Sequence, residues 1–167
     1  QLNALAISGD VIYELKSTYD GTTGETFPIT INQVSTVGGN WTVTIRPSAG
    51  VGMRTTSGSS ASAVIKLNGA DRIILDGREG GVGTTSAWTV SNVNSAAATA
   101  AIWLSSLGAA AGSMSNTIEY LTLSCGVDQS ASSSETFGIL SCGMTIGAND
   151  GADNDANSFA ANRITKA

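Results

Sequence analysis

Three short segments decide the fold of this chain: IKLNG (65–69), IWLSS (102–106) and ILSCG (139–143). Their first residues, Ile65, Ile102 and Ile139, follow one another at a constant interval of 37 residues. Self-similarity with a period of about 20–50 residues is the sequence signature of stacked repeat architectures. The spacing therefore predicts a solenoid in which these segments lie one above the other as strands.

A second series accompanies the first. An Asp or Asn stands two residues before an isoleucine in Asp71-Arg72-Ile73, Asn116-Thr117-Ile118 and Asn162-Arg163-Ile164, at intervals of 45 and 46 residues. Asn and Asp tolerate the left-handed backbone geometry that a corner between strands requires. We expect Asp71, Asn116 and Asn162 to stack at one corner as a hydrogen-bonded ladder.

Composition narrows the class of protein and its partners. The chain of 167 residues is 41% hydrophobic and only 13% charged, which indicates one folded, β-rich domain. Its net charge is −5, and its eight Lys and Arg residues are scattered, which disfavours nucleic acid and anionic membrane surfaces as partners. No apolar run approaches the roughly 20 residues of a transmembrane helix, so we expect no membrane insertion. The chain begins at Gln1 without a signal sequence, and we expect a processed product or a piece of a longer protein.

The pattern along the chain predicts a single β-helix domain over residues 1–167. Residues 1–9 are expected to form an N-terminal cap with a short helix over 2–7, and residues 10–62 the first, irregular coils. Residues 63–167 are expected to form regular coils with growing loops at 105–115 and 143–161. Insertions in a solenoid map to one side of the stack, which is often the functional side.

Six stretches together resemble the right-handed parallel β-helix segments of large secreted or cell-surface proteins of Bacteroidetes type: LNALAISGDVIYELKSTYDGTTGETFPITI (2–31), WTVTIRPSAG (41–50), VIKLNGADRIILDG (64–77), AAIWLSS (100–106), NTIEYLTLS (116–124) and DNDANSFAANRIT (153–165). The resemblance implies an all-β, right-handed, single-stranded parallel β-helix with a helix capping the first coil. It also implies a scaffold or adhesin-like role in an extracellular setting.

Parallel β-helices also include polysaccharide lyases and hydrolases, so catalytic carboxylates need a test. The best candidates are Asp71, Asp76 and Glu79, with Arg78 beside them. Such a group could act as an acid/base pair or as a cation site with a base. Asp76-Gly77 is also a common turn, and the next coil is expected to carry Tyr120 where this one has Asp76. No row of carboxylates is then predicted, and we expect a protein that is not an enzyme and needs no cofactor.

The most acidic segment suggests calcium as the one metal to consider. Asp150, Asp153, Asp155 and Asn157 supply the oxygen ligands that hard cations prefer. Asp153, Asp155 and Asn157 match the first, third and fifth positions of an EF-hand loop, but the glycine and the final glutamate of that motif are missing. The alternatives are a calcium-binding loop of another kind and a hydrogen-bonded loop without a cation.

Two further residue pairs leave alternatives open. Cys125 and Cys142 lie in matching Ser-Cys-Gly triplets and could form a disulfide or remain two buried thiols. Trp41 and Trp88 each begin a Trp-Thr-Val run and could stack against a glycan or pack as shielding hydrophobes.

The final coil is expected to lack a cap, since nothing after Ile164 resembles one. Solenoids expose unpaired strand edges at their ends. We therefore predict that this coil contacts further domains of the same chain or another copy. The predicted function is a non-enzymatic, extracellular structural or adhesive solenoid that self-associates, with a polysaccharide-binding or polysaccharide-degrading β-helix as the alternative.

Overall fold

The stack of isoleucines predicted from the repeat is present in the structure. The computed structural model describes residues 6–126, 135–147 and 153–166. Ile102 pairs with Ile65 on one side and with Ile139 on the other, and Ile65 pairs in turn with Ile29. The 37-residue interval is therefore the length of one complete coil at this position.

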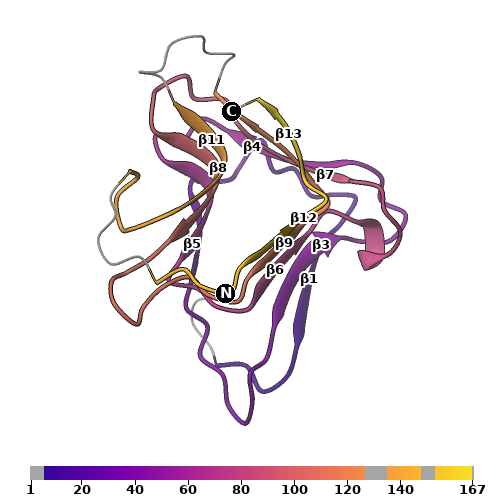
Figure 1. The fold of residues 1–167 in the computed structure, drawn as a ribbon. Coiled ribbons are helices and arrows are strands. Elements are labelled where there is room, and N and C mark those ends of the chain that lie inside the picture. Colours follow the sequence, from indigo (N-terminus) through magenta and orange to yellow (C-terminus); the bar gives the residue numbers. More distant parts are fainter. Residues whose placement is uncertain (1–5, 127–134, 148–152, 167) are drawn as a thin grey trace.

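The strands form three parallel sheets that enclose a triangular core (Figure 1). Sheet 1 consists of β1 (Val11–Leu15), β3 (Val43–Pro47), β6 (Ile73–Asp76), β9 (Thr117–Glu119) and β12 (Ser158–Ala160). Sheet 2 consists of β4 (Arg54–Gly58), β7 (Trp88–Asn92), β10 (Leu121–Cys125) and β13 (Arg163–Lys166). Sheet 3 consists of β2 (Ile29–Asn32), β5 (Ala63–Asn68), β8 (Thr99–Ser105) and β11 (Thr136–Cys142). Along the chain the strands follow this order, but the first coil meets sheet 2 only through the Gly21–Thr56 bridge and the last described coil ends in sheet 2. The region 10–62, expected to be irregular, contributes β1 to β4 to the same sheets.

The predicted all-β parallel solenoid is thus confirmed, but the predicted N-terminal helix is not shown. Residues 1–5 lie outside the described part. Ile7 forms a parallel bridge with Thr36, and its amide donates to the Ser35 carbonyl at 2.9 Å. Within the described ranges the only helix is the single 3-10 turn η2 (Glu79–Gly81). Residue 7 pairs with the coil above it instead of continuing a helix.

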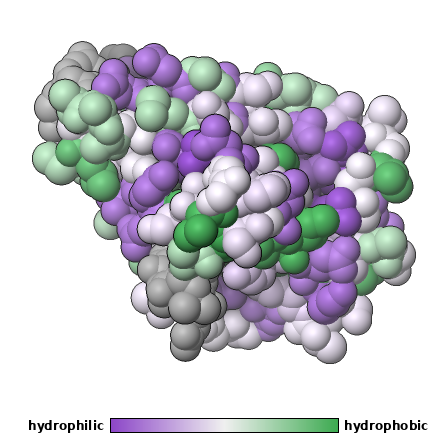
Figure 2. Space-filling model, turned by 90° about the horizontal axis from the view of Figure 1, so that it is seen from below, coloured by the Kyte–Doolittle hydropathy of each residue, from purple (hydrophilic) through white to green (hydrophobic). Residues whose placement is uncertain are grey.

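The core consists of apolar side chains that stack in register between coils. Leu67 and Leu104 are paired neighbours of sheet 3, and both are fully buried. A side chain at Gly138 would meet the side chain of Ile164, which lies across from it on β13. On the outside, hydrophobic and hydrophilic residues are interspersed on the flank seen in Figure 2, and no single hydrophobic patch covers it.

The second predicted series is wrong, because its members do not occupy one column. Ile118 pairs with Leu75 below it and with Phe159 above it, both in sheet 1. Ile164 lies in sheet 2, where it pairs with Leu123. The corner between β9 and β10 is the single residue Tyr120, whereas the corresponding corner one coil earlier is residues 77–87. Equal distances along the chain therefore do not lead to equal places in the coil.

Asparagines do connect successive coils, but at different corners. Asn116 accepts a hydrogen bond from the Ile73 amide at 2.8 Å and donates to the Ala70 carbonyl at 2.9 Å. Asn157 repeats this one coil later, with the Asn116 amide and the Ser113 carbonyl as its partners. The residues before these positions have a left-handed backbone, which turns amide and carbonyl groups away from the regular ladder. The asparagine side chain replaces the missing partners.

Asn162 has the same role between sheets 1 and 2, where it accepts from the Leu121 amide and donates to the Ile118 carbonyl. Asn92 has it between sheets 2 and 3. Its side chain is fully buried, accepts from the Ser60 amide, and donates to the carbonyls of Ser60 and Ala100. The expected single ladder is therefore a set of separate bridges, one type at each corner.

We predict that Asn92→Ala lowers the free energy of unfolding by about 2–4 kcal/mol, because it leaves several buried backbone groups without partners. Urea unfolding followed by circular dichroism measures this loss. Asn40→Ala, at an exposed position before Trp41, serves as the control and should change stability little. A loss for Asn92→Ala no larger than that of the control would contradict the role assigned to these bridges.

Candidate functional site

The candidate carboxylate Asp76 lies at the end of β6 in a salt-bridged cluster. Although it is only 4% exposed, each of its oxygens accepts a 2.9 Å hydrogen bond from the Arg78 guanidinium. Arg78 also donates to Glu119 Oε1 at 2.6 Å, and its guanidinium lies over the Tyr120 ring, 4.4 Å from the centroid. The hydrogen bonds to Asp76, followed by the nearby negative charges, raise the pKa of Arg78. Both oxygens of the Asp76 carboxylate are therefore hydrogen-bonded within this cluster.

Contrary to expectation, the next coil does carry a carboxylate beside Asp76, although the coil after it has Ala160 at this position. Glu119 pairs directly with Asp76, so the residue equivalent to Asp76 in the next coil is Glu119 and not Tyr120. In the first two coils Glu14 pairs with Arg46, with 3.6 Å between the carboxylate and the guanidinium. Tyr120 is not the equivalent of Asp76 because it occupies the left-handed corner position immediately after β9.

The other two candidate catalytic carboxylates lie elsewhere. Asp71 lies before β6, at the opposite end of the strand from Asp76, and accepts hydrogen bonds from the Met114 amide and the Gln33 side chain. Glu79 lies in η2 and accepts from the Gly50 amide at 3.1 Å. The structure therefore brings Asp76 and Arg78 together with Glu119, while Asp71 and Glu79 have separate structural partners.

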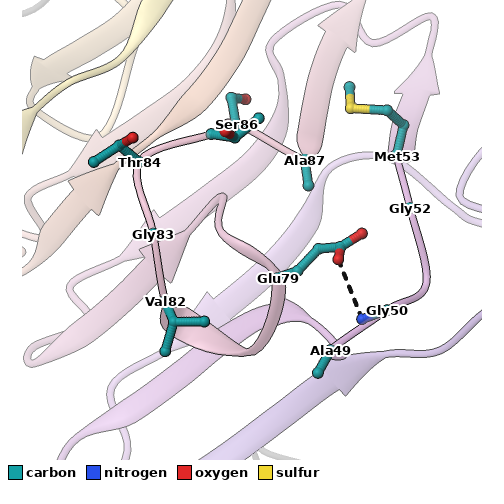
Figure 3. A pocket seen from close by; sticks show the side chains of 11 residues that line it. Ala49, Gly50, Gly52, Met53, Glu79, Val82, Gly83, Thr84, Ser86 and Ala87 are labelled. Atoms are coloured by element: carbon teal, nitrogen blue, oxygen red, sulfur yellow. Dashed lines mark hydrogen bonds between the residues drawn. The ribbon is translucent and has the colours of Figure 1, made fainter.

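Glu79 faces a pocket on the flank of the solenoid. The pocket has a volume of about 550 Å³ and lies between the two corner segments that connect sheets 1 and 2 in the second and third coils (Figure 3). Met53 and Val82 supply exposed apolar surface, and Thr84 and Ser86 supply hydroxyl groups. One coil later this corner is only Tyr120, and Gly77 is required where the Tyr120 carbonyl passes closest. The pocket forms because long corners, residues 48–53 and 77–87, lie in two successive coils. The coil after them has only Tyr120 at this position.

The candidate calcium ligands are only partly within the described residues. Asp150 lies outside them. Asp153 Oδ2 accepts a 2.6 Å hydrogen bond from the Ala110 amide, and the Asn157 side chain is engaged with the coil below. In the described ranges no group of three or more His, Cys, Asp or Glu side chains is placed to hold a cation. These side chains connect the segment predicted as loop 143–161 to loop 105–115. The predicted loop includes strand β12. Calcium binding stays a prediction.

The paired cysteines and tryptophans are not brought together. Cys125 ends β10 in sheet 2 and Cys142 ends β11 in sheet 3, and both are free, buried thiols. Trp88 is 2% exposed, and its indole donates to the Thr56 hydroxyl at 3.0 Å, so its ring is not accessible to a glycan. Trp41 lies before β3, in the corner that follows sheet 3, and its indole donates to the Val37 carbonyl. The two rings therefore cannot form one platform.

The C-terminal coil contains exposed residues whose equivalents in the coil directly before it are buried in the core. Phe159 is 48% exposed, although its neighbour Ile118 is fully buried. Ile164 is 54% exposed, although its neighbour Leu123 is fully buried. Ile164 was expected at an uncapped end, but Phe159, like Glu119, was missed. In Ser158-Phe159-Ala160 a large apolar residue stands between two small ones, directly before the corner at Ala161-Asn162. With the strand register known, this pattern would have identified Phe159 as an inward-facing residue.

We predict that Arg78→Met lowers the free energy of unfolding by about 2–4 kcal/mol, because it leaves the buried Asp76 carboxylate beside Glu119 without a counter-ion. Guanidinium unfolding measures the change, and the double variant Asp76→Asn with Arg78→Met should recover part of it. Lys16→Met, which breaks an exposed ion pair with Glu14, is the control and should have little effect. Equal effects of the two single variants would exclude a stabilising role for the cluster.

Comparison with known proteins identifies one family. The family model described as "Protein of unknown function (DUF1565)" matches residues 3–167. Searches among curated proteins and among solved structures gave no match. Because the model spans almost the entire sequence, the chain belongs to the DUF1565 family.

Proposed function

We propose that this chain is a non-enzymatic structural or adhesive unit of the cell surface that associates with further copies of itself through its C-terminal coil. One observation carries this proposal. Phe159 on β12 and Ile164 on β13 occupy core columns, yet about half of each side chain is exposed. A stacked partner would bury both residues as the earlier coils bury Ile118 and Leu123.

The backbone of the same coil supports the proposal. All residues of β12 and β13 are exposed, and in the described sheets each of these strands is paired on one side only. An unpaired strand edge is a ready template for another strand, and main-chain hydrogen bonds then supply affinity. Apolar columns and free edges at the same end favour the addition of further coils over the binding of a small molecule.

The geometry of the carboxylates supports a role without catalysis. Both oxygens of Asp76 are held by Arg78, and Asp71 lies at the other end of the strand. General acid/base hydrolysis of a glycosidic bond needs two carboxyl groups that flank the same bond. The carboxylates that do lie together, Asp76 and Glu119, share one guanidinium and act as a structural pair.

The proposal extends to a location at the cell surface, which follows from the resemblance of the sequence to β-helix segments of secreted and cell-surface proteins. No helix among the described residues is long and apolar enough to cross a membrane.

A second candidate function is binding of a polysaccharide, and the pocket beside Glu79 is the observation that favours it. Its volume of about 550 Å³ suits one or two sugar residues. Thr84 and Ser86 could bond sugar hydroxyls, and the exposed Met53 side chain could contact a pyranose face.

We predict that the purified chain forms species heavier than the 16.8 kDa monomer, and that their mass rises with concentration. Ile164→Lys should leave only the monomer, because it places a charge in the surface that a partner would bury. Light scattering after size-exclusion chromatography measures both.

Val93→Lys is the matched control, since Val93 is 56% exposed but lies on the corner between sheets 2 and 3. It should associate as the native chain does. A native chain that stays monomeric at every accessible concentration would refute the proposed self-association.

We also predict that the chain does not cleave polysaccharides, because Asp76 is already engaged. Reducing-end assays on a panel of neutral and acidic polysaccharides test this. Turnover that disappears in Asp76→Ala would establish an enzyme instead. Perturbation of the Met53 methyl signal by an oligosaccharide, reduced in Glu79→Gln, would support the second candidate.

A further inference from the structure

We propose that the partner is a second copy in head-to-tail orientation, so that the C-terminal coil of one molecule stacks on the N-terminal coil of the next in the register of sheets 1 and 2. This inference rests on the proposed self-association and adds its polarity, its register and the residues that meet.

Charge supports the polarity. Strands β12 and β13 contain Arg163 and Lys166 and no acidic residue, while Asp153 and Asp155 lie in the corner before β12. The segment 10–25, which forms most of the N-terminal coil, contains four acidic residues and one basic residue, Lys16. The positive charges of β13 and the acidic segment 10–25 favour head-to-tail contact, whereas a contact between two β13 strands would bring like charges together.

The columns of sheet 1 give the first contact. Tyr13 pairs with Ile45, and the same column continues through Leu75 and Ile118 to Phe159. Tyr13 is 40% exposed and Phe159 is 48% exposed. These are the two ends of one core column, and both are large aromatic residues with uncovered surface. Stacking in register places the Phe159 ring of one copy against the Tyr13 ring of the next, where each buries surface that is now open to water.

The columns of sheet 2 give the second contact. Thr55, Thr89 and Thr122 pair in succession, and Thr122 pairs with Arg163. At the other end Gly21 bridges Thr56, so Asp20 is the residue aligned with Thr55. Asp20 and Arg163 are both exposed, and in the same stacked register they lie opposite each other between two copies.

Local contacts prepare Asp20 for this pairing. Its carboxylate accepts hydrogen bonds from the side chains and amides of Thr22 and Thr23. The bonds from Thr22, followed by those from Thr23, hold the pKa of Asp20 far below its usual range. The turn therefore presents a fixed negative charge at the N-terminal coil.

A head-to-tail contact uses two different surfaces and does not close on itself, so it produces an open chain of copies. Sheet 3 has no strand above β11 among the described residues, while sheets 1 and 2 continue to β12 and β13. The contact is therefore made chiefly by sheets 1 and 2, which carry both proposed residue pairs.

Charge reversal in separate molecules tests the register. Arg163→Glu alone and Asp20→Arg alone place like charges at every junction, and each should raise the concentration at half association by about tenfold or more. In an equimolar mixture of the two variants an alternating chain has opposite charges at every junction. We expect the mixture to recover association to within about threefold of the native chain, as measured by sedimentation velocity.

A matched control replaces Asp20→Arg by the double variant Arg163→Glu with Glu79→Arg, which reverses a charge on the flank. A mixture of Arg163→Glu with this double variant should not recover, because every junction still brings like charges together. Native association without recovery in the Asp20→Arg mixture would overturn the register and leave the proposed self-association intact. A native species that stops at twice 16.8 kDa would indicate contact between like ends and overturn the polarity. A native chain that never associates would refute the proposed function itself.

Discussion

The hydrogen bonds between successive parallel strands are the constraint on which the rest of this molecule depends. They fix the height of one coil, because each strand can pair only with the strands directly above and below it. Side chains that point inward must then repeat in register, which is why Ile65, Ile102 and Ile139 occupy one column. Where a left-handed corner interrupts the ladder, a buried amide such as Asn92 or Asn116 restores the missing hydrogen bonds. The asparagines therefore belong to the backbone architecture and are not free to act as a binding row.

The same constraint explains why charged residues of sheet 1 and its corner form a cluster of ion pairs. Stacking places Asp76 next to Glu119, and two adjacent carboxylates would repel each other if nothing lay between them. Arg78 bridges the two carboxylates and lies over the ring of Tyr120. An arginine in this position turns a repulsive pair into a stable column. It also leaves both oxygens of Asp76 hydrogen-bonded.

A solenoid also differs from a closed domain in where it leaves apolar surface uncovered. In a layered core each side chain is buried by other elements, whereas here the cover comes from the next coil along the axis. The inward residues of the first and last coils are therefore the most exposed members of their columns, as Tyr13 and Phe159 are. The described ends of the stack are therefore where its apolar columns are least covered, and the flank provides loops and a pocket.

The sequence by itself determined the class of fold and the length of a coil, because apolar residues that stack must recur at the coil interval. It also predicted an uncapped coil at Ile164 and loops that grow on one side. Only the tertiary structure decided which residues meet across coils: Glu119 rather than Tyr120 over Asp76, Phe159 over Ile118, and Arg78 between two carboxylates. The physical reason lies in the corners. One corner between sheets 1 and 2 is residues 77–87, and the next is Tyr120 alone. Separation along the chain is therefore not proportional to position around the coil, and only the paired strands reveal the register.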